Sequence, residues 1–285
     1  MTQPITAEQQ KAIDANIYVH SFLANAGEYV KSPHFRPENR AKVRAIVERV
    51  VPSAPVSGTM QAIDFGCGTG FMIDLVKDLF GEVHGVDITQ DMMKQVDLSS
   101  GNVFLHESLA ESTPFATGRF DFACAYSFMD HLHDYRKFLE EAYRVLRVGG
   151  VFYSDLNPNR AFIENIASLA RMGTDKVSPI VAREFAGVLS NGTHYQDSVG
   201  LDATMLELAE PGKSIDKGFD ATEVLKAAKA IGFSDCKVEY EWYLGQAKVM
   251  HKQSAALAQS VDEYLCSILP ASAPLYKYLR FIFTK

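Results

Sequence analysis

The chain has 285 residues, of which 47% are hydrophobic, and this is enough for one sizeable core. Its formal net charge is −7 and no block of Lys or Arg stands out, so we expect neither nucleic acid nor an anionic membrane surface as a partner. The N-terminus lacks an apolar signal region, and no apolar run approaches the roughly 18 residues that a membrane span needs. Four scattered cysteines form no Cys-x-x-Cys pair, which is typical of reduced thiols in a cytoplasmic protein and argues against a zinc site.

Two helices are expected to form an N-terminal cap segment over residues 1–58. Apolar side chains at helical spacing predict the first helix over residues 6–30. Pro37 suits the first turn of a second helix, which runs to about Val51.

A core region is expected over residues 59–158, where short apolar strands alternate with helices. This alternation predicts a doubly wound, mostly parallel α/β sheet. The predicted strands cover 62–65, 83–86, 103–105, 120–126 and 151–154, and the predicted helices cover 71–79, 91–96 and 135–146. Gly149 and Gly150 are expected to end the last of these helices.

The remaining chain is expected to form a cap insertion, 159–218, followed by the C-terminal part of the core sheet, 219–285. A helix over 219–231, with Asp220 as N-cap, precedes strands at 237–244 and 278–283. A helix over 247–268 is inserted between these two strands. The sequence therefore predicts seven strands, with antiparallel pairing at one edge of the sheet.

A glycine loop follows the first strand and opens a helix. Gly66, Gly68 and Gly70 lie two residues apart, with Asp64 two residues before the first of them. Glycines at this spacing let the backbone turn sharply and approach a ligand closely. A dinucleotide-binding loop would use Gly-x-Gly-x-x-Gly spacing to seat a pyrophosphate, so a nucleotide-dependent dehydrogenase is disfavoured.

A second acid, Asp87, ends the next strand. A carboxylate at this place can accept hydrogen bonds from both hydroxyls of a ribose. Ser108, Leu109 and Ala110 follow the third strand, where they could border an adenine. The ends of neighbouring parallel strands converge at one edge of a sheet, which predicts one ligand site there.

These motifs resemble the core of the class I S-adenosylmethionine-dependent methyltransferases, and most of all the branch that includes ubiquinone/menaquinone and other small-molecule methyltransferases. The resemblance covers about a third of the chain. It is carried by Ile63 to Gly70, Gly85 to Ile88, Pro114 to Asp121, and Arg144 to Gly150.

The resemblance implies that S-adenosyl-L-methionine is the cofactor. It implies contacts to the methionine part from the glycine loop, to the ribose from Asp87, and to the adenine from Leu109 and Ala110, with Tyr126 near the methyl donor. Tyr29 is expected to fold over the cofactor, as a tyrosine does in similar enzymes. The expected cofactor-binding residues are Tyr29, Asp64, Gly66, Cys67, Gly68, Gly70, Asp87, Ile88, Leu109, Ala110 and Tyr126. Leu109 stands where the family usually has an acid, and Glu107 could substitute for that acid.

His131, with Tyr126 before it, is the best-placed catalytic candidate on the acceptor side. Similar methyltransferases often carry a histidine there, and it would be needed as a base only if the nucleophile must lose a proton. A structural histidine near a helix start is the alternative. His194 and Tyr195 are weaker candidates, and no metal-ligand constellation is evident.

The sequence thus predicts methyl transfer by in-line displacement to a small-molecule acceptor. Two alternatives remain open: other S-adenosylmethionine chemistry, such as cyclisation or transfer of another group, and a non-catalytic binding protein on the same fold. The acceptor, the atom that is methylated and the oligomeric state are left open by the sequence.

Overall fold

The computed structural model describes residues 6–27, 33–51, 60–189 and 200–285. Three of the predicted site residues, Tyr29, His194 and Tyr195, lie outside these ranges. Within them, no helix combines the length and apolar character needed to cross a lipid bilayer.

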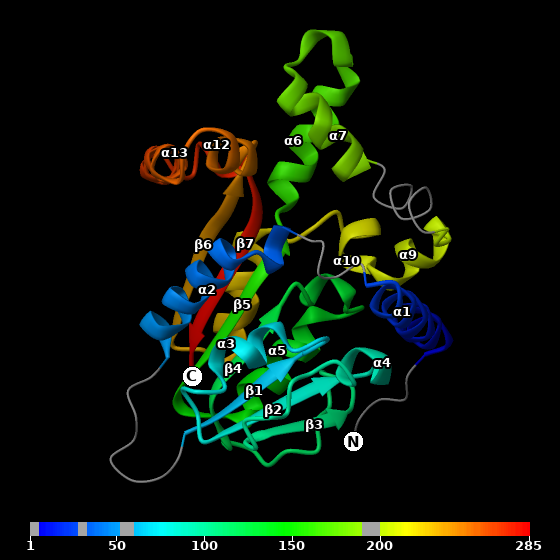
Figure 1. Ribbon diagram of the computed structural model, residues 1–285, viewed down its shortest axis with the longest axis vertical. Helices are drawn as coiled ribbons and strands as arrows, with labels where there is room; N and C mark the ends of the chain where they lie inside the picture. Colours follow the sequence, from blue (N-terminus) through cyan, green and yellow to red (C-terminus); the bar gives the residue numbers. More distant parts are fainter. Residues whose placement is uncertain (1–5, 28–32, 52–59, 190–199) are drawn as a thin grey trace.

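One sheet of seven strands forms the centre of the molecule, in the order β3-β2-β1-β4-β5-β7-β6 (Figure 1). The strands are β1 (Gln61–Phe65), β2 (Glu82–Asp87), β3 (Val103–Glu107), β4 (Phe120–Tyr126), β5 (Leu146–Pro158), β6 (Asp235–Tyr243) and β7 (Tyr276–Thr284). The first five pair in parallel, whereas β7 is antiparallel to both β5 and β6. The predicted fold class, with its antiparallel edge, is confirmed.

Helices cover both faces of this sheet. Alternate residues of each buried strand point to opposite faces, so Ile63 packs with α5 (Tyr135–Val145) and α11 (Ala221–Ile231). Its neighbour Ala62 packs with α2 (Pro37–Val50) and α3 (Phe71–Val76) on the other face. The helices are α1 (Ala7–Asn25), α2 (Pro37–Val50), α3 (Phe71–Val76), α4 (Gln90–Met93), α5 (Tyr135–Val145), α6 (Arg160–Arg171), α7 (Pro179–Leu189), α9 (Ala203–Ala209), α10 (Pro211–Ser214), α11 (Ala221–Ile231), α12 (Gln246–Lys252) and α13 (Ala255–Ser267). The predicted N-cap is confirmed, since the Asp220 side chain accepts a hydrogen bond from the backbone N–H of Glu223.

Two predicted boundaries were wrong. The helix α5 ends at Val145 and runs directly into β5, so the two glycines lie inside a strand that begins at Leu146. The helix predicted over 247–268 is divided into α12 and α13, because the Ser254 side chain accepts a hydrogen bond from the N–H of Leu257 and caps a new helix.

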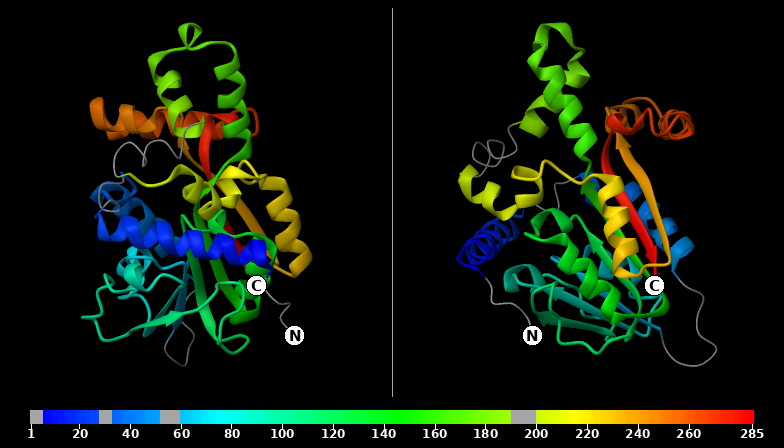
Figure 2. Two further views of the ribbon diagram at one scale, coloured as in Figure 1. Left: turned by 90° about the vertical axis from the view of Figure 1, so that its right-hand side faces the viewer. Right: turned by 180° about the vertical axis from the view of Figure 1, so that it is seen from behind.

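A cap is formed where α1 packs against α9, two helices that are far apart in the sequence (Figure 2). Their apolar contacts form a small core of their own, separate from the two cores that flank the sheet. Its buried residues are Ala15, Val19, Leu23, Leu201, Leu206 and Ala209. This core holds the N-terminal segment and the insertion together over one end of the sheet.

A buried ionic network ties the antiparallel edge to the parallel strands. Arg280 of β7, with only 3% of its side chain exposed, donates to Asp155 of β5 at 2.9 Å and pairs with Glu239 and Glu241 of β6. Tyr153 donates a further hydrogen bond to Asp155 at 2.6 Å. Buried charges of this kind are tolerated only while each has its partner.

The substitution Arg280→Leu is expected to lower the free energy of unfolding by about 3–5 kcal/mol, because it leaves the buried carboxylate of Asp155 without its cation. Denaturant titration followed by circular dichroism measures this loss. The control is Arg49→Leu, since Arg49 is 60% exposed and pairs with Glu239 at the surface. Equal effects of the two substitutions would contradict the structural role of the buried network.

Candidate functional site

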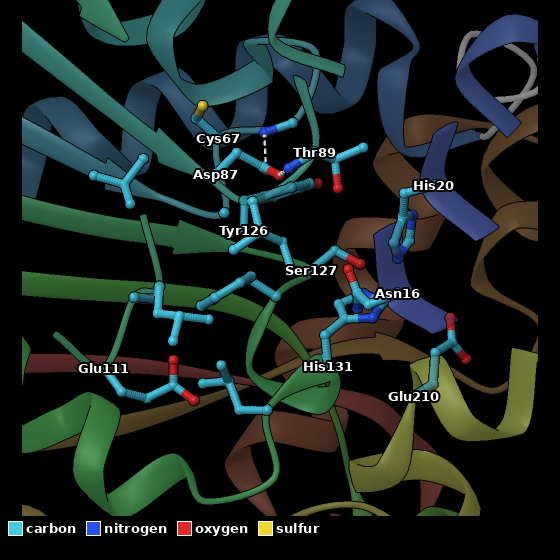
Figure 3. A pocket seen from close by; sticks show the side chains of 18 of the residues that line it. Asn16, His20, Cys67, Asp87, Thr89, Glu111, Tyr126, Ser127, His131 and Glu210 are labelled. Carbon is cyan, nitrogen blue, oxygen red and sulfur yellow. Dashed lines mark hydrogen bonds between the residues drawn. The ribbon is translucent and has the colours of Figure 1, made fainter. Parts of the chain in front are cut away.

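A cavity of about 1190 Å³ lies between the carboxyl ends of the central strands and the cap. Its walls come from the glycine loop, from the segments that follow β2, β3 and β4, from Leu156 of β5, and from α1 and α10. Figure 3 shows this space, with Asp87 and Thr89 on one side and His131 and Asn16 on another. The predicted ligand site at the strand ends is therefore a real cavity with a cap over it.

The glycine loop takes up conformations that other residues adopt with strain. Gly66, Gly68 and Gly70 have φ angles of 65°, 52° and 90°. A Cβ on Gly66 would lie 2.0 Å from the ring of Phe128, so this glycine makes room for a side chain of the protein. A Cβ on Gly68 would meet Met92 at 3.0 Å, and both Gly66 and Gly68 line the cavity.

Asp87 connects the end of β2 to this loop. One of its carboxylate oxygens accepts from the N–H of Gly68 and the other from the N–H of Thr89, each at 2.8 Å (Figure 3). Burial raises the pKa of Asp87, while these backbone donors favour its charged form. A carboxylate keeps further lone pairs when each oxygen accepts one bond, so Asp87 can still accept from a ligand in the cavity.

Asp64 is buried behind the loop and does not line the cavity. Its Oδ1 accepts a weak hydrogen bond from the thiol of Cys124 at 3.5 Å, and burial raises the pKa of Asp64 to about 8. Burial thus favours the protonated form of this carboxyl. Gly70 also lies outside the cavity wall, whereas Cys67 and Ile88 are part of it.

The segment after β3 supplies another wall of the cavity. Leu109 and Ala110 both line it, as expected from the sequence. Glu107 is exposed and accepts a hydrogen bond from Gln90, so it does not substitute for the acid that Leu109 replaces. Glu111, which sequence reasoning missed, lines the cavity instead, and burial raises the pKa of its carboxyl.

Tyr126 lies at the end of β4 with its ring stacked on Phe71, at 4.4 Å between ring centroids. Its hydroxyl accepts a hydrogen bond from Asn39 of α2 at 2.9 Å, and burial raises the pKa of this phenol above its ordinary value. The next residue, Ser127, has a φ of 51°, which is uncommon for a residue other than glycine. Tyr126 and Ser127 both line the cavity.

His131 lines the cavity in the short η3 helix (Met129–His131). Sequence reasoning missed the polar side chains that surround it, namely Asn16 and His20 from α1, and Glu210 and Lys213 from the insertion. No short motif contains these residues, because they are far apart in the sequence and are brought together only by the packing of the cap on the sheet.

Asp130, His131 and Glu210 offer ligand atoms within 4.8 Å of one another, which could hold a metal ion. In this structure a cation of the protein lies there: the Lys213 ammonium is 2.8 Å from Asp130 and 3.2 Å from Glu210. Burial opposes the charge on Lys213, but the two carboxylates raise its pKa above the ordinary value. That the site binds no metal stays a prediction.

A protein-family model described as a methyltransferase domain matches residues 63–154. These residues contain the glycine loop, Asp87, Leu109, Tyr126 and His131. The central part of the chain is a methyltransferase domain.

Curated relatives of this methyltransferase domain match the core at moderate identity. A protein from Mycolicibacterium smegmatis, named as an S-adenosylmethionine-dependent methyltransferase, is 34% identical over 34% of this chain and 38% of its own length. The demethylmenaquinone methyltransferase of Staphylococcus aureus is 34% identical over 36% of this chain and 46% of its own length. A mitochondrial protein of Rattus norvegicus, named arginine-hydroxylase, is 22% identical over 89% of this chain and 71% of its own length. The chain thus spans less than half the length of these two methyltransferases.

Solved methyltransferase structures share the fold. The phosphoethanolamine N-methyltransferase 2 of Haemonchus contortus superposes with a TM-score of 0.55 at 16% identity, over 96% of this chain and 59% of that one. An S-adenosylmethionine-dependent methyltransferase of Thermotoga maritima superposes with a TM-score of 0.53 at 16% identity, over 94% of this chain and 99% of that one. At these identities the likeness concerns the fold alone.

The residues present fit this cofactor. Gly68 lines the cavity, and the Asp87 carboxylate has spare acceptor sites. Leu109 and Ala110 offer an apolar wall for an adenine.

The substitution Asp87→Ala is expected to weaken S-adenosylmethionine binding by about 2–3 kcal/mol, because it removes charge-assisted hydrogen bonds to the ribose and frees the Gly68 N–H. Isothermal titration calorimetry measures the affinity. Glu107→Ala is the matched control, since Glu107 ends the neighbouring strand outside the cavity. Unchanged affinity in a folded Asp87→Ala protein would contradict the ribose assignment.

The pH dependence of stability should reveal the buried Asp64. Its pKa is raised on folding, so its contribution to stability is fully present below the ordinary carboxyl pKa and is lost as pH rises to about 8. We expect the unfolding free energy of the ligand-free protein, relative to that of Asp64→Asn, to fall between pH 5 and 8 and then level off. Denaturant titrations of both proteins across this range test it, and a constant difference would contradict a protonated Asp64.

Proposed function

We propose that this chain transfers a methyl group from S-adenosylmethionine to a small-molecule acceptor held under the cap. The observation that carries the proposal is the single cavity that adjoins both the glycine loop with Asp87 and the polar residues of the cap. When bound, the cofactor supplies an electrophilic methyl group on a sulfonium. A cavity of this size has room for a small acceptor beside it.

The residues of the chain would contribute mainly alignment. Asp87 and the loop N–H groups fix one end of the cavity, and the stacked ring of Tyr126 forms a wall near its middle. The α1 and α10 helices cover the acceptor end and exclude water from it. Holding two reactants in line in this way removes much of the entropic barrier to a displacement.

A small-molecule acceptor is supported by the names of the relatives, which include ubiquinone and menaquinone methyltransferases. The acidic net charge supports an acceptor other than nucleic acid or a membrane surface. All four cysteines are free, which supports a reducing compartment such as the cytoplasm. The relative named arginine-hydroxylase covers more of the chain than the methyltransferases do, and it favours chemistry other than methyl transfer on this fold as the second candidate.

Product analysis separates these candidates. The protein is incubated with S-adenosylmethionine and pools of small phenols, amines and quinols, and the products are followed by mass spectrometry. We expect release of S-adenosylhomocysteine and an acceptor that has gained one methyl group. Neither product should form with Asp87→Ala. Release of methylthioadenosine would indicate transfer of another group, and cofactor binding without any product would favour a binding protein.

A further inference from the structure

One backbone carbonyl of the cap lies directly above the candidate catalytic histidine. The Ala209 oxygen, at the end of α9, is 3.2 Å from Nδ1 of His131. A carbonyl oxygen can only accept a hydrogen bond, so this contact forms only when Nδ1 carries the proton. In a neutral imidazole the other nitrogen, Nε2, is then an acceptor.

The same carbonyl accepts a second hydrogen bond, from the Asn16 side-chain amide at 3.1 Å. Asn16 belongs to α1, has 9% of its surface exposed, and is 193 positions away from Ala209 in the sequence. Asn16 and His131 therefore share one acceptor, the Ala209 oxygen. Because Asn16 and the carbonyl are both fixed by the packing of α1 on α9, the ring of His131 is oriented by the closed cap.

The charged groups around the ring are paired with one another. Asp130, which is 1% exposed, and Glu210 both hold the Lys213 ammonium. His20 packs edge-on against His131 at 4.7 Å, and burial, together with repulsion from His131 and Lys213, lowers the pKa of His20 well below its ordinary value. Among the described residues, the hydrogen bond of the His131 ring is the one from Nδ1 to the Ala209 oxygen. The other ring nitrogen, Nε2, is therefore available to a ligand in the cavity.

We propose that the cap sets His131 in its Nδ1–H form, with Ala209 and Asn16 as positioning residues, so that Nε2 accepts the proton of an O–H or N–H acceptor. This inference rests on the proposed function. In the reaction the acceptor oxygen or nitrogen forms a bond to the methyl carbon, the carbon–sulfur bond breaks, and its electron pair stays on sulfur. The acceptor proton goes to Nε2, and the imidazolium later returns it to water.

The proposal has a direct spectroscopic test that does not need turnover. Long-range ¹⁵N–¹H correlation spectra of the full chain, labelled in histidine, report which ring nitrogen carries the proton. The His131 signals are assigned by their loss in His131→Gln, and spectra are recorded at pH 8 with and without S-adenosylhomocysteine. We expect protonated Nδ1 and bare Nε2, and the opposite tautomer or an imidazolium at this pH would overturn the proposal.

The role of Asn16 is tested by Asn16→Leu, which keeps the size of the side chain and removes the donor. We expect His131 to populate both tautomers in this variant, and a wild-type spectrum would overturn the role of Asn16. Gln10→Leu is the control, because Gln10 lies exposed on the same helix and its side chain donates to Asp14 of that helix. Asn16→Ala is the second variant if leucine prevents folding, and the wild-type spectrum tests the tautomer in either case.

Turnover provides the link to catalysis. With an acceptor whose nucleophile carries a proton, His131→Gln should lower the single-turnover rate about 10²-fold, with cofactor affinity unchanged. Asn16→Leu should act in the same direction with a smaller effect. Wild-type rates in folded His131→Gln would overturn the proposal, whereas failure to bind S-adenosylmethionine would instead overturn the proposed function and leave the tautomer result standing.

Discussion

The ion pair between Arg280 and Asp155 supports much of the rest of this structure. Asp155 lies near the end of β5, where its Oδ1 accepts from the N–H of Leu156 at 2.7 Å and its backbone oxygen accepts from the N–H of Ser127 at 2.9 Å. Leu156 and Ser127 both have positive φ angles, 57° and 51°, and both line the cavity. Residues in such conformations persist only when their surroundings hold them, so the buried pair shapes the floor of the cavity while it fastens β7 to β5.

The two ends of the cavity are built in different ways. The cofactor end depends on contacts between neighbouring elements: Gly68 and Asp87 lie within the unit formed by β1, α3 and β2, and Thr89 follows it directly. The acceptor end depends on contacts between distant segments, because Asn16, His131 and Ala209 come from three elements that meet only after the cap has packed. Loss of apolar contacts between α1 and α9 would therefore disturb the acceptor end before the cofactor end.

The contrast between local and distant contacts explains what could be predicted from the sequence. The alternation of strands and helices, the order of the glycines and the place of Asp87 are local features, and the structure has the predicted sheet with that loop and that acid at the cavity. The path of β5 through two glycines was missed because their partner is distant in the sequence: the N–H of Gly149 donates to the backbone oxygen of Lys285, and the N–H of Lys285 donates to that of Gly150. This pairing is not visible in the local pattern. Glu111 was missed in favour of Glu107 because the turn after β3 decides which of the two carboxylates faces inward.

The two ends of the cavity also differ in how much the relatives can reveal about them. The match to the methyltransferase domain ends at residue 154, before Leu156, Ala209 and Lys213, and it begins after Asn16 and His20. It therefore includes the cofactor end and His131, but none of the groups that orient His131. A relative can share the glycine loop, Asp87 and even the histidine without sharing the carbonyl that sets its tautomer. The acceptor of this chain is consequently better sought through the chemistry of the cap than through the names attached to the core.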